Sequence, residues 1–204
     1  MIAIVDYGSG NVAAIADIFK RLKVPHAVTA DHDALRAADR YILPGVGAFD
    51  TTMRHFIDSG LVAVLNEQVT VLHKKVLGIC VGMQILAESS AEGLLPGLGW
   101  IPGRVRKIDT THLKNGPRLP HMGWNSVRTL GDAALFNGVD LARGFYFLHS
   151  YYFDASDRST VQAVVDYGSE LPCAVARDNV FGMQFHPEKS HANGVAVFRN
   201  FAAV

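Results

Sequence analysis

The sequence predicts an α/β fold built on a mixed sheet whose parallel half comes from the amino-terminal part of the chain. There, short apolar strands alternate with helices that have one apolar face, as in successive β-α units. In the second half, short strand-like runs follow one another without long helices between them, which favours antiparallel pairing. One buried strand ends at a cysteine between two glycines, and we expect a site there.

Length and composition are those of a single domain. The 204 residues are 49% hydrophobic, enough for one sizeable core, so we expect one domain over residues 1–204. The 19 basic and 19 acidic residues cancel, and bulk charge predicts neither a nucleic-acid nor a membrane partner. Cys80 and Cys173 do not form a disulfide framework. Without a signal peptide or a bilayer-spanning apolar run, we expect a cytoplasmic protein.

The first β-α unit has a strand at residues 2–5, a turn at 6–11 and a helix at 12–22. Apolar residues recur every three or four positions along this helix, and Asn11 is expected to cap it. The glycines at 8 and 10 match only the beginning of a dinucleotide-binding loop. We interpret the stretch as a tight β-α turn, with nucleotide binding as a weak alternative.

A glycine-rich loop follows the third predicted strand. A strand at 26–30 and a short helix at 34–38, capped within 31–33, lead to a strand at 40–43 and then to Pro44-Gly45-Val46-Gly47. Such a loop exposes N–H groups at the carboxyl edge of the sheet, where open parallel sheets bind ligands. An ordinary connection is the alternative. Helices are expected at 48–57 and 61–73.

Cys80 is predicted to lie on a turn between a strand and a helix. Residues 76–79 are apolar, Gly78 and Gly82 bracket the cysteine, and helix formers occupy 83–88. This arrangement lifts the side chain above the sheet and directs helical N–H groups at its target. A helix N-terminus also favours the thiolate, which is the nucleophile. The alternative is an inert buried cysteine, which we expect for Cys173.

The second half of the chain is expected to be mostly strands. A loop-rich passage and a polar, turn-rich stretch at 110–120 separate them, and an amphipathic helix closes the chain at 195–201. The expected strands lie at 104–108, 122–127, 145–153, 161–166, 173–177 and 180–185.

His186 is the strongest candidate for a base that serves Cys80. In an extended chain, His186 and Glu188 share a face, and Pro187 stiffens the link. A carboxylate there can orient the imidazole while the other ring nitrogen faces the sulfur. A strand-end histidine beside a solvated glutamate is the alternative. The zinc spacings CxxC and HExxH do not occur, so no metal is expected.

Taken together, residues 78–84 and 184–188 resemble the class I glutamine amidotransferases. Val81 is a small departure, since leucine is more usual there. Stretches at 6–11, 44–47, 121–125 and 186–190 resemble one subgroup, the glutaminase subunits that supply ammonia to a cyclase in histidine biosynthesis. The resemblance implies a flavodoxin-like, three-layer fold. Its central sheet is mixed and mainly parallel with helices on both faces, and a smaller antiparallel sheet accompanies it.

The same resemblance implies roles for individual residues. Cys80 is the nucleophile that attacks the glutamine side chain, His186 is base and then acid, and Glu188 orients His186. In relatives the glycine-rich loop is thought to supply an oxyanion donor only when the partner's ligand is bound. The implied oxyanion residues are Val46, Gly47 and Val81, and the implied substrate-binding residues are Gly45, Gln84, Ser150 and Tyr151.

These 204 residues show no P-loop and no second composition block for a domain that accepts nitrogen, so we expect ammonia to pass to another chain. The resemblance implies a heterodimer with a (β/α)8-barrel cyclase and no cofactor. Met122 and Trp124 are interface candidates because interfaces favour such side chains, although Trp124 could equally be core. The residues that match contacting positions in relatives are Asn11, Tyr146 and Lys189.

Three other functions stay open. A glutaminase subunit for anthranilate, aminodeoxychorismate, pyridoxal phosphate or guanylate synthesis would share the triad, but residues 121–125 argue against it. A cysteine amidase or peptidase of similar fold would share the turn at Cys80, but Gln84 and the 45–47 loop suit a small side chain better. A non-catalytic assembly subunit is the third, and the complete triad argues against it.

Overall fold

The computed structural model of the protein describes residues 1–111 and 119–204. The expected turn-rich stretch at 110–120, in which we interpret His112 as a loop or surface residue, therefore falls largely outside the described residues. None of the helices in the described part has the length and apolarity that a membrane crossing requires.

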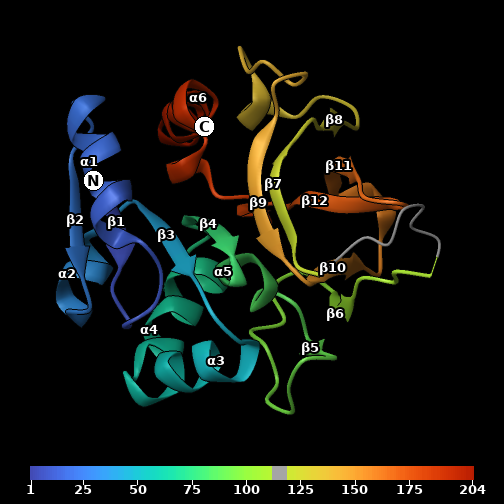
Figure 1. The fold of residues 1–204 in the computed structure, drawn as a ribbon. Helices are drawn as coiled ribbons and strands as arrows, with labels where there is room; N and C mark the ends of the chain where they lie inside the picture. Colours follow the sequence, from blue (N-terminus) through green and yellow to red (C-terminus); the bar gives the residue numbers. More distant parts are fainter. Residues whose placement is uncertain (112–118) are drawn as a thin grey trace.

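Among the described residues, the main sheet has eight strands (Figure 1). The first five in spatial order are mutually parallel, and the last three are antiparallel to their neighbours. In spatial order the strands are β2 (His26–Thr29), β1 (Ile2–Val5), β3 (Arg40–Gly45), β4 (Lys75–Cys80), β13 (Val180–Met183), β12 (Glu170–Arg177), β11 (Val161–Asp166) and β8 (Arg128–Thr129).

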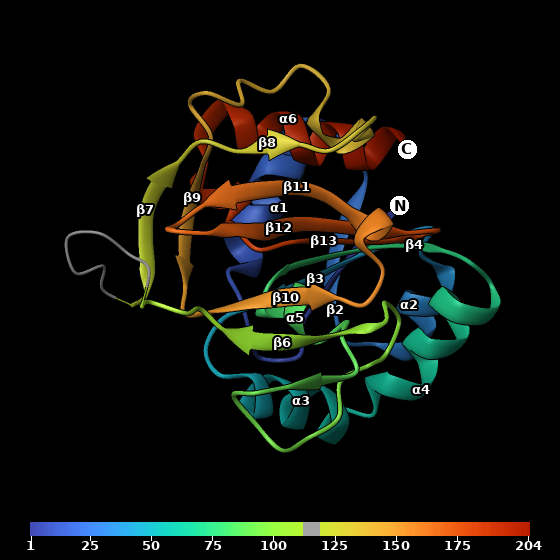
Figure 2. The same cartoon turned by 90° about the vertical axis from the view of Figure 1, so that its right-hand side faces the viewer.

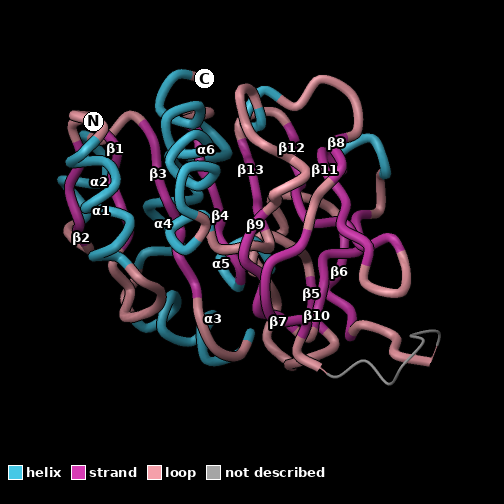
Figure 3. The backbone as a smooth tube through the Cα atoms, turned by 45° about the horizontal axis from the view of Figure 1, so that its top comes forward, coloured by secondary structure: helices cyan, strands magenta, loops and turns pink. Residues whose placement is uncertain are grey.

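The position of β13 corrects one expectation. Although β13 belongs to the second half of the chain, it lies beside β4 (Figure 3) and pairs with it in parallel. It forms an antiparallel hairpin with β12 and lies between β12 and β4, so its direction matches that of β4. Asn179 in the hairpin turn fixes this position, because its Nδ2 donates to the carbonyls of Val69 and Lys74 at 2.8 Å each.

Two small sheets stand beside the main one (Figure 2). The expected strand at 145–153 is divided at Ser150, where the chain leaves one small sheet and enters the other. One sheet pairs β7 (His121–Asn125) with β9 (Phe145–His149), and the other has the order β10 (Tyr151–Ala155), β6 (Gly103–Lys107) and β5 (Ser89–Ser90).

Helices cover both faces of the main sheet, giving three layers (Figure 2). On one face Phe19 of α1 contacts Phe198 of α6, with ring centroids 5.2 Å apart. The expected caps are present, since Asn11 and Asp31 accept N–H groups of α1 and α2. The helices are α1 (Val12–Arg21), α2 (His32–Ala37), α3 (Phe49–Asp58), α4 (Leu61–Asn66), α5 (Val81–Gln84) and α6 (His191–Ala203), with a π-helical turn η1 (Glu67–Val71) and 3-10 turns η2 (Ala134–Phe136), η3 (Arg158–Thr160) and η4 (Pro187–Lys189).

The helix expected at 83–88 is wrong in both length and start. The helix that follows Cys80, α5, has a single turn at Val81–Gln84. Four N–H groups of the loop at 97–101 donate to the carbonyls of residues 85–88, at 2.7–3.1 Å. Those carbonyls therefore bind a distant loop instead of the next helical turn, and the macrodipole expected behind Cys80 shrinks to that of one turn.

Candidate active site

Cys80 lies on a sharp turn at the carboxyl end of β4. Its φ of 55° and ψ of −114° place it in a region that residues other than glycine rarely adopt. The flanking glycines allow the turn to approach β3, because a Cβ at Gly82 would lie 1.9 Å from the Leu43 carbonyl oxygen. A Cβ at Gly78 would lie 2.4 Å from the Gly82 oxygen. Close packing of backbone on backbone therefore holds the cysteine in place.

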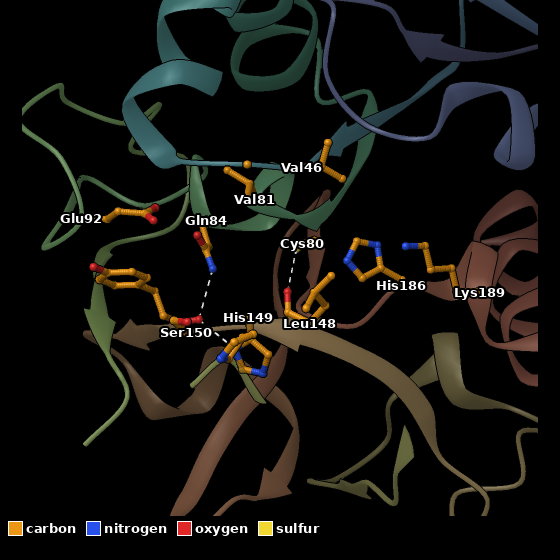
Figure 4. Close-up of a pocket in the computed structure, with 13 residues that line it drawn as sticks. Val46, Cys80, Val81, Gln84, Glu92, Leu148, His149, Ser150, His186 and Lys189 are labelled. Carbon is orange, nitrogen blue, oxygen red and sulfur yellow. Dashed lines mark hydrogen bonds between the residues drawn. The ribbon is translucent and has the colours of Figure 1, made fainter. Parts of the chain in front are cut away.

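The thiol faces a cavity of about 250 Å³. Figure 4 shows Val46 and Val81 on one side of Cys80, His149 and Ser150 on the other, and the His186 ring beside the cysteine. The cavity thus lies where the ends of β3 and β4 meet the β9–β10 junction and η4. It is lined by Val46, Gly47, Cys80, Val81, Gln84, Glu92, Pro120, Leu148, His149, Ser150, Tyr151, His186 and Lys189.

His186 and Glu188 form a buried pair beside the thiol. Nδ1 of His186 lies 2.8 Å from Oε1 of Glu188, and both side chains are 2% exposed. The backbone between His186 and Glu188 is not extended as expected, because Pro187 begins the 3-10 turn η4. The sequence-predicted contact between imidazole and carboxylate is nevertheless present, and it leaves Nε2 as the nitrogen for the sulfur.

The surroundings of His186 hold a proton on its ring. Burial by itself lowers the pKa of His186, but hydrogen bonds to Cys80 and Glu188 and the charges of those groups outweigh it. The net effect raises the pKa of His186 to about 10. An imidazole of this kind accepts the proton of a neighbouring thiol readily and stabilises the thiolate that remains.

The glycine-rich loop is tied to the first turn of the chain. The Val46 N–H donates to Ser9 Oγ at 3.0 Å, and the Ser9 hydroxyl lies 3.2 Å from the Val46 carbonyl, to which it donates. The Tyr7 hydroxyl donates to the Pro44 carbonyl. In this conformation the N–H of Val46 is therefore engaged by Ser9. Gly47, with φ of 97°, lines the cavity, as Val46 does.

The expected substrate-binding residues do not all reach the cavity. Gln84, Ser150 and Tyr151 line it, and Gln84 Nε2 donates to the Tyr151 carbonyl at 3.2 Å and to Gln184 Oε1 at 3.0 Å. Its amide nitrogen is thus occupied, which leaves Oε1 for a ligand. Gly45 is absent from the lining. It packs behind the turn, where a Cβ would lie 2.4 Å from the Gly82 nitrogen.

Several lining residues had no role in the sequence analysis. Glu92 lines the cavity and accepts the Phe49 N–H at 2.9 Å, at the start of α3. Leu148 contributes its carbonyl, which lies 3.9 Å from Cys80 Sγ. These residues lie in a loop and an aromatic strand without a motif of their own. Cys173, expected to be inert core, is fully buried, and burial raises the pKa of its thiol.

Two interface candidates on β7, Met122 and Trp124, form an exposed apolar patch with Leu148 of β9 beside the cavity. Trp124 is opposite Tyr146 and Met122 is opposite Leu148, so each pair shares a face of the ribbon. Met122, Trp124 and Leu148 are 65%, 42% and 36% exposed, which excludes Trp124 from the core. We call these three residues the β7–β9 patch.

The other interface candidates are also accessible. Asn11 and Lys189 are exposed, and Tyr146 is half-buried. The Lys189 Nζ lies 5.7 Å from the centre of the Tyr146 ring, within range of a cation–π contact. Lys189 also lines the cavity, so this group adjoins the site.

Comparisons with known proteins agree with this geometry. The glutamine amidotransferase class-I family model matches residues 3–204. The chain is 48% identical over 204 residues to the imidazole glycerol phosphate synthase subunit HisH of Bdellovibrio bacteriovorus, and 45% identical over 206 residues to that of Leptospira borgpetersenii. Both matches cover 100% of each sequence.

Solved structures share the fold. A crystal structure of a glutamine amidotransferase matches with a TM-score of 0.74 at 19% identity, covering 100% of both chains. A PurLQS structure from Thermotoga maritima matches with a TM-score of 0.71 at 18% identity, covering 99% of this chain and 97% of that one. Because the family model spans nearly the whole sequence and full-length relatives exceed 40% identity, the chain belongs to the class I glutamine amidotransferase family.

Proposed function

We propose that this chain is the glutaminase subunit of an imidazole glycerol phosphate synthase, which releases ammonia from glutamine for a separate cyclase in histidine biosynthesis. The buried His186–Glu188 pair beside Cys80 carries the proposal, because hydrolysis of an amide needs a nucleophile with an oriented base. The full-length HisH relatives support the choice of synthase over anthranilate, aminodeoxychorismate, pyridoxal phosphate or guanylate synthesis.

The triad accounts for each proton in the reaction. His186 takes the proton of the Cys80 thiol, and the thiolate attacks the side-chain carbonyl of glutamine. The same proton then passes to the departing nitrogen, which leaves as ammonia and a thioester remains. Water attacks the thioester, His186 takes a proton from it and returns that proton to sulfur as glutamate leaves. The Val81 N–H, adjoining Cys80, is assigned as the first oxyanion donor.

The second donor is assigned to the 45–47 loop and requires a change in its conformation. Rotation of the Gly45–Val46 peptide would release the Val46 N–H from Ser9 and turn it toward the cavity. The glycines on either side of Val46 permit this rotation. Loss of one oxyanion donor typically lowers kcat by about 10²- to 10³-fold, so the loop held by Ser9 is a slow resting state.

The α-amino-acid end of glutamine is assigned to the Ser150–Tyr151 backbone, with Gln84 Oε1 as a further acceptor. Gly45 would act by letting the loop lie close behind the turn, where a side chain does not fit. No cofactor is needed for this chemistry.

Ammonia must reach its acceptor without entering bulk water, where most of it is protonated near neutral pH and is no longer nucleophilic. We assign the partner surface to the β7–β9 patch with Asn11, Tyr146 and Lys189, because this surface adjoins the cavity through Leu148 and Lys189. The partner is a (β/α)8-barrel cyclase in a heterodimer. Residues 1–204 would act as one cytoplasmic domain, supported by a core cluster that runs from Ile2 to Phe201.

The Cys80→Ala substitution is expected to abolish glutamate release and glutamine-dependent synthesis in the complex with the cyclase. Synthesis from ammonium salts should persist, because the cyclase then needs only ammonia. Cys173→Ala, which changes a buried cysteine away from the cavity, is the matched control and should retain glutamine-dependent synthesis. Loss of the ammonium-driven reaction in Cys80→Ala would contradict the division of labour. A wild-type complex that releases no glutamate, with or without the cyclase's nucleotide ligand, would refute the function.

The Glu188→Gln substitution is expected to lower kcat for glutamine by roughly 100-fold or more, by analogy with the loss of an orienting carboxylate in other triads. Since the Glu188 charge raises the pKa of His186, its removal should move the basic limb of the kcat/KM profile to lower pH. Steady-state rates of glutamate release from about pH 6 to about pH 11, a range that spans the pKa of His186, measure both effects. Glu188→Asp keeps the charge and should keep the basic limb near its wild-type position. If the basic limb of the kcat/KM profile of Glu188→Gln lay at the same pH as in the wild type, the carboxylate would not act on His186.

The Ser9→Ala substitution is expected to raise glutaminase activity of the isolated chain about fivefold, the size of one ordinary hydrogen bond that favours the resting loop. Ser9→Thr retains a hydroxyl and is the matched control. Both rates are measured by glutamate release without cyclase. Equal basal rates in Ser9→Ala and the wild type would mean that Ser9 does not hold the loop.

The Trp124→Ala substitution is expected to weaken association with the cyclase about 30-fold, because an exposed indole beside the cavity has the character of an interface hot spot. Leu72→Ala is the control for loss of apolar surface. Leu72 is exposed and precedes the start of β4, at the end of that strand away from Cys80. Isothermal titration calorimetry of each variant with the cyclase gives both dissociation constants. An unchanged dissociation constant for Trp124→Ala would remove the β7–β9 patch from the interface.

A further inference from the structure

Two buried histidines beside the cavity take no part in the reaction described above. His121 on β7 and His149 on β9 are direct partners in the ribbon, and they are 3% and 5% exposed. Nδ1 of His121 lies 3.0 Å from Nε2 of His149. The His121 ring is stacked between Phe147 and Tyr167, with centroids 4.7 Å and 4.1 Å away. Both rings are thus held in fixed positions.

The hydrogen-bond partners determine which nitrogen carries each proton. Nδ1 of His149 lies 2.8 Å from the Tyr151 carbonyl oxygen, which only accepts, so this nitrogen must carry hydrogen. Burial lowers the pKa of His149 to about 3 and that of His121 to about 4, so both rings are neutral near pH 7. A neutral ring has one N–H, and Nε2 of His149 is therefore an acceptor.

The hydrogen bonds of His121 and Asn125 fix the tautomer of His121 in the same way. His121 must donate from Nδ1 to His149, which leaves its Nε2 as an acceptor for Asn125 Nδ2 at 3.4 Å. Asn125 Nδ2 also donates to the Asp166 carbonyl at 2.9 Å, which fixes the orientation of that amide. A backbone carbonyl at each end thus sets one direction for the whole series of hydrogen bonds.

The series ends at the junction where β9 passes into β10. His149, Ser150 and Tyr151 all line the cavity, and the Ser150 carbonyl accepts the Ile108 N–H at 3.0 Å. The Tyr151 carbonyl receives both His149 Nδ1 and Gln84 Nε2, the latter at 3.2 Å. Because Ser150 belongs to neither strand, side chains must supply part of the support that a sheet ladder gives elsewhere.

We propose that His121 and His149 are positioning residues that hold the Ser150–Tyr151 junction in the shape that receives the α-amino-acid end of glutamine. This inference rests on the proposed glutaminase function. His149 fixes the Tyr151 peptide, and His121 fixes the orientation and tautomer of His149. Met122, the next residue on β7, points outward in the β7–β9 patch, so one strand joins the assigned partner surface to the substrate site.

Two substitutions of His121 separate its hydrogen bond from its packing. His121→Phe keeps a ring between Phe147 and Tyr167 and removes the donor to His149. His121→Asn places an amide donor near the former Nδ1 and gives up the ring. In complex with the cyclase, His121→Phe is expected to raise KM for glutamine about tenfold with a much smaller change in kcat. The ammonium-driven rate should be unchanged, and His121→Asn should recover much of the wild-type KM.

Side-chain nitrogen NMR of the wild-type protein tests the same arrangement without a substitution. Long-range ¹H–¹⁵N correlations near pH 7 are expected to show both histidines neutral and protonated at Nδ1. Protonation at Nε2 of either ring would overturn the proposal, as would an unchanged KM in His121→Phe. A KM defect that His121→Asn does not relieve would also overturn it, because packing alone would then explain the effect.

The outcomes also distinguish this inference from the function on which it rests. A wild-type complex that releases no glutamate refutes the glutaminase function, whatever the tautomers. A wild-type complex that is active, with His121→Phe indistinguishable from it, refutes the positioning role alone.

Discussion

The parallel pairing of β4 with β13 is the constraint on which the site depends. Gly78 lies opposite Gly182, so the two strands end at the same edge of the sheet. Cys80 ends one strand and His186 follows the other within a few residues, which brings together side chains from distant parts of the sequence. The hydrogen bonds of Asn179 hold the β12–β13 hairpin in this position. Without that register Cys80 and His186 would not meet.

Much of the fold, and the contact of His186 with Glu188 near Cys80, could be predicted because these features depend on short-range patterns. The first β-α unit carries its apolar stripe and its Asn11 cap within a few turns, and both occur where the spacing places them. Cys80 between glycines and the His186–Glu188 spacing are equally local, and the family resemblance links them. The exposed position of Trp124 required the structure, since an aromatic residue on a short strand suits a core as well as a surface.

The features that could not be predicted depend on contacts between distant segments. The helix after Cys80 does not run on to residue 88, because the loop at 97–101 binds the carbonyls of residues 85–88, and no propensity in 83–88 reveals this. The hydrogen bonds of Ser9 to Val46 join the first turn of the chain to the third strand's loop. The His121–His149 contact likewise needs the register of β7 with β9, which alternation alone does not set.

At Cys80 the backbone conformation that favours glycine for folding is occupied by a residue with a side chain. A side chain with positive φ costs on the order of 1 kcal/mol that glycine avoids, and the tight approach of the turn to β3 gives no room to relax it. A descendant released from amide hydrolysis would therefore gain folding free energy by exchanging this cysteine for glycine. A thiol at such a costly backbone position fits a reactive role better than a purely architectural one.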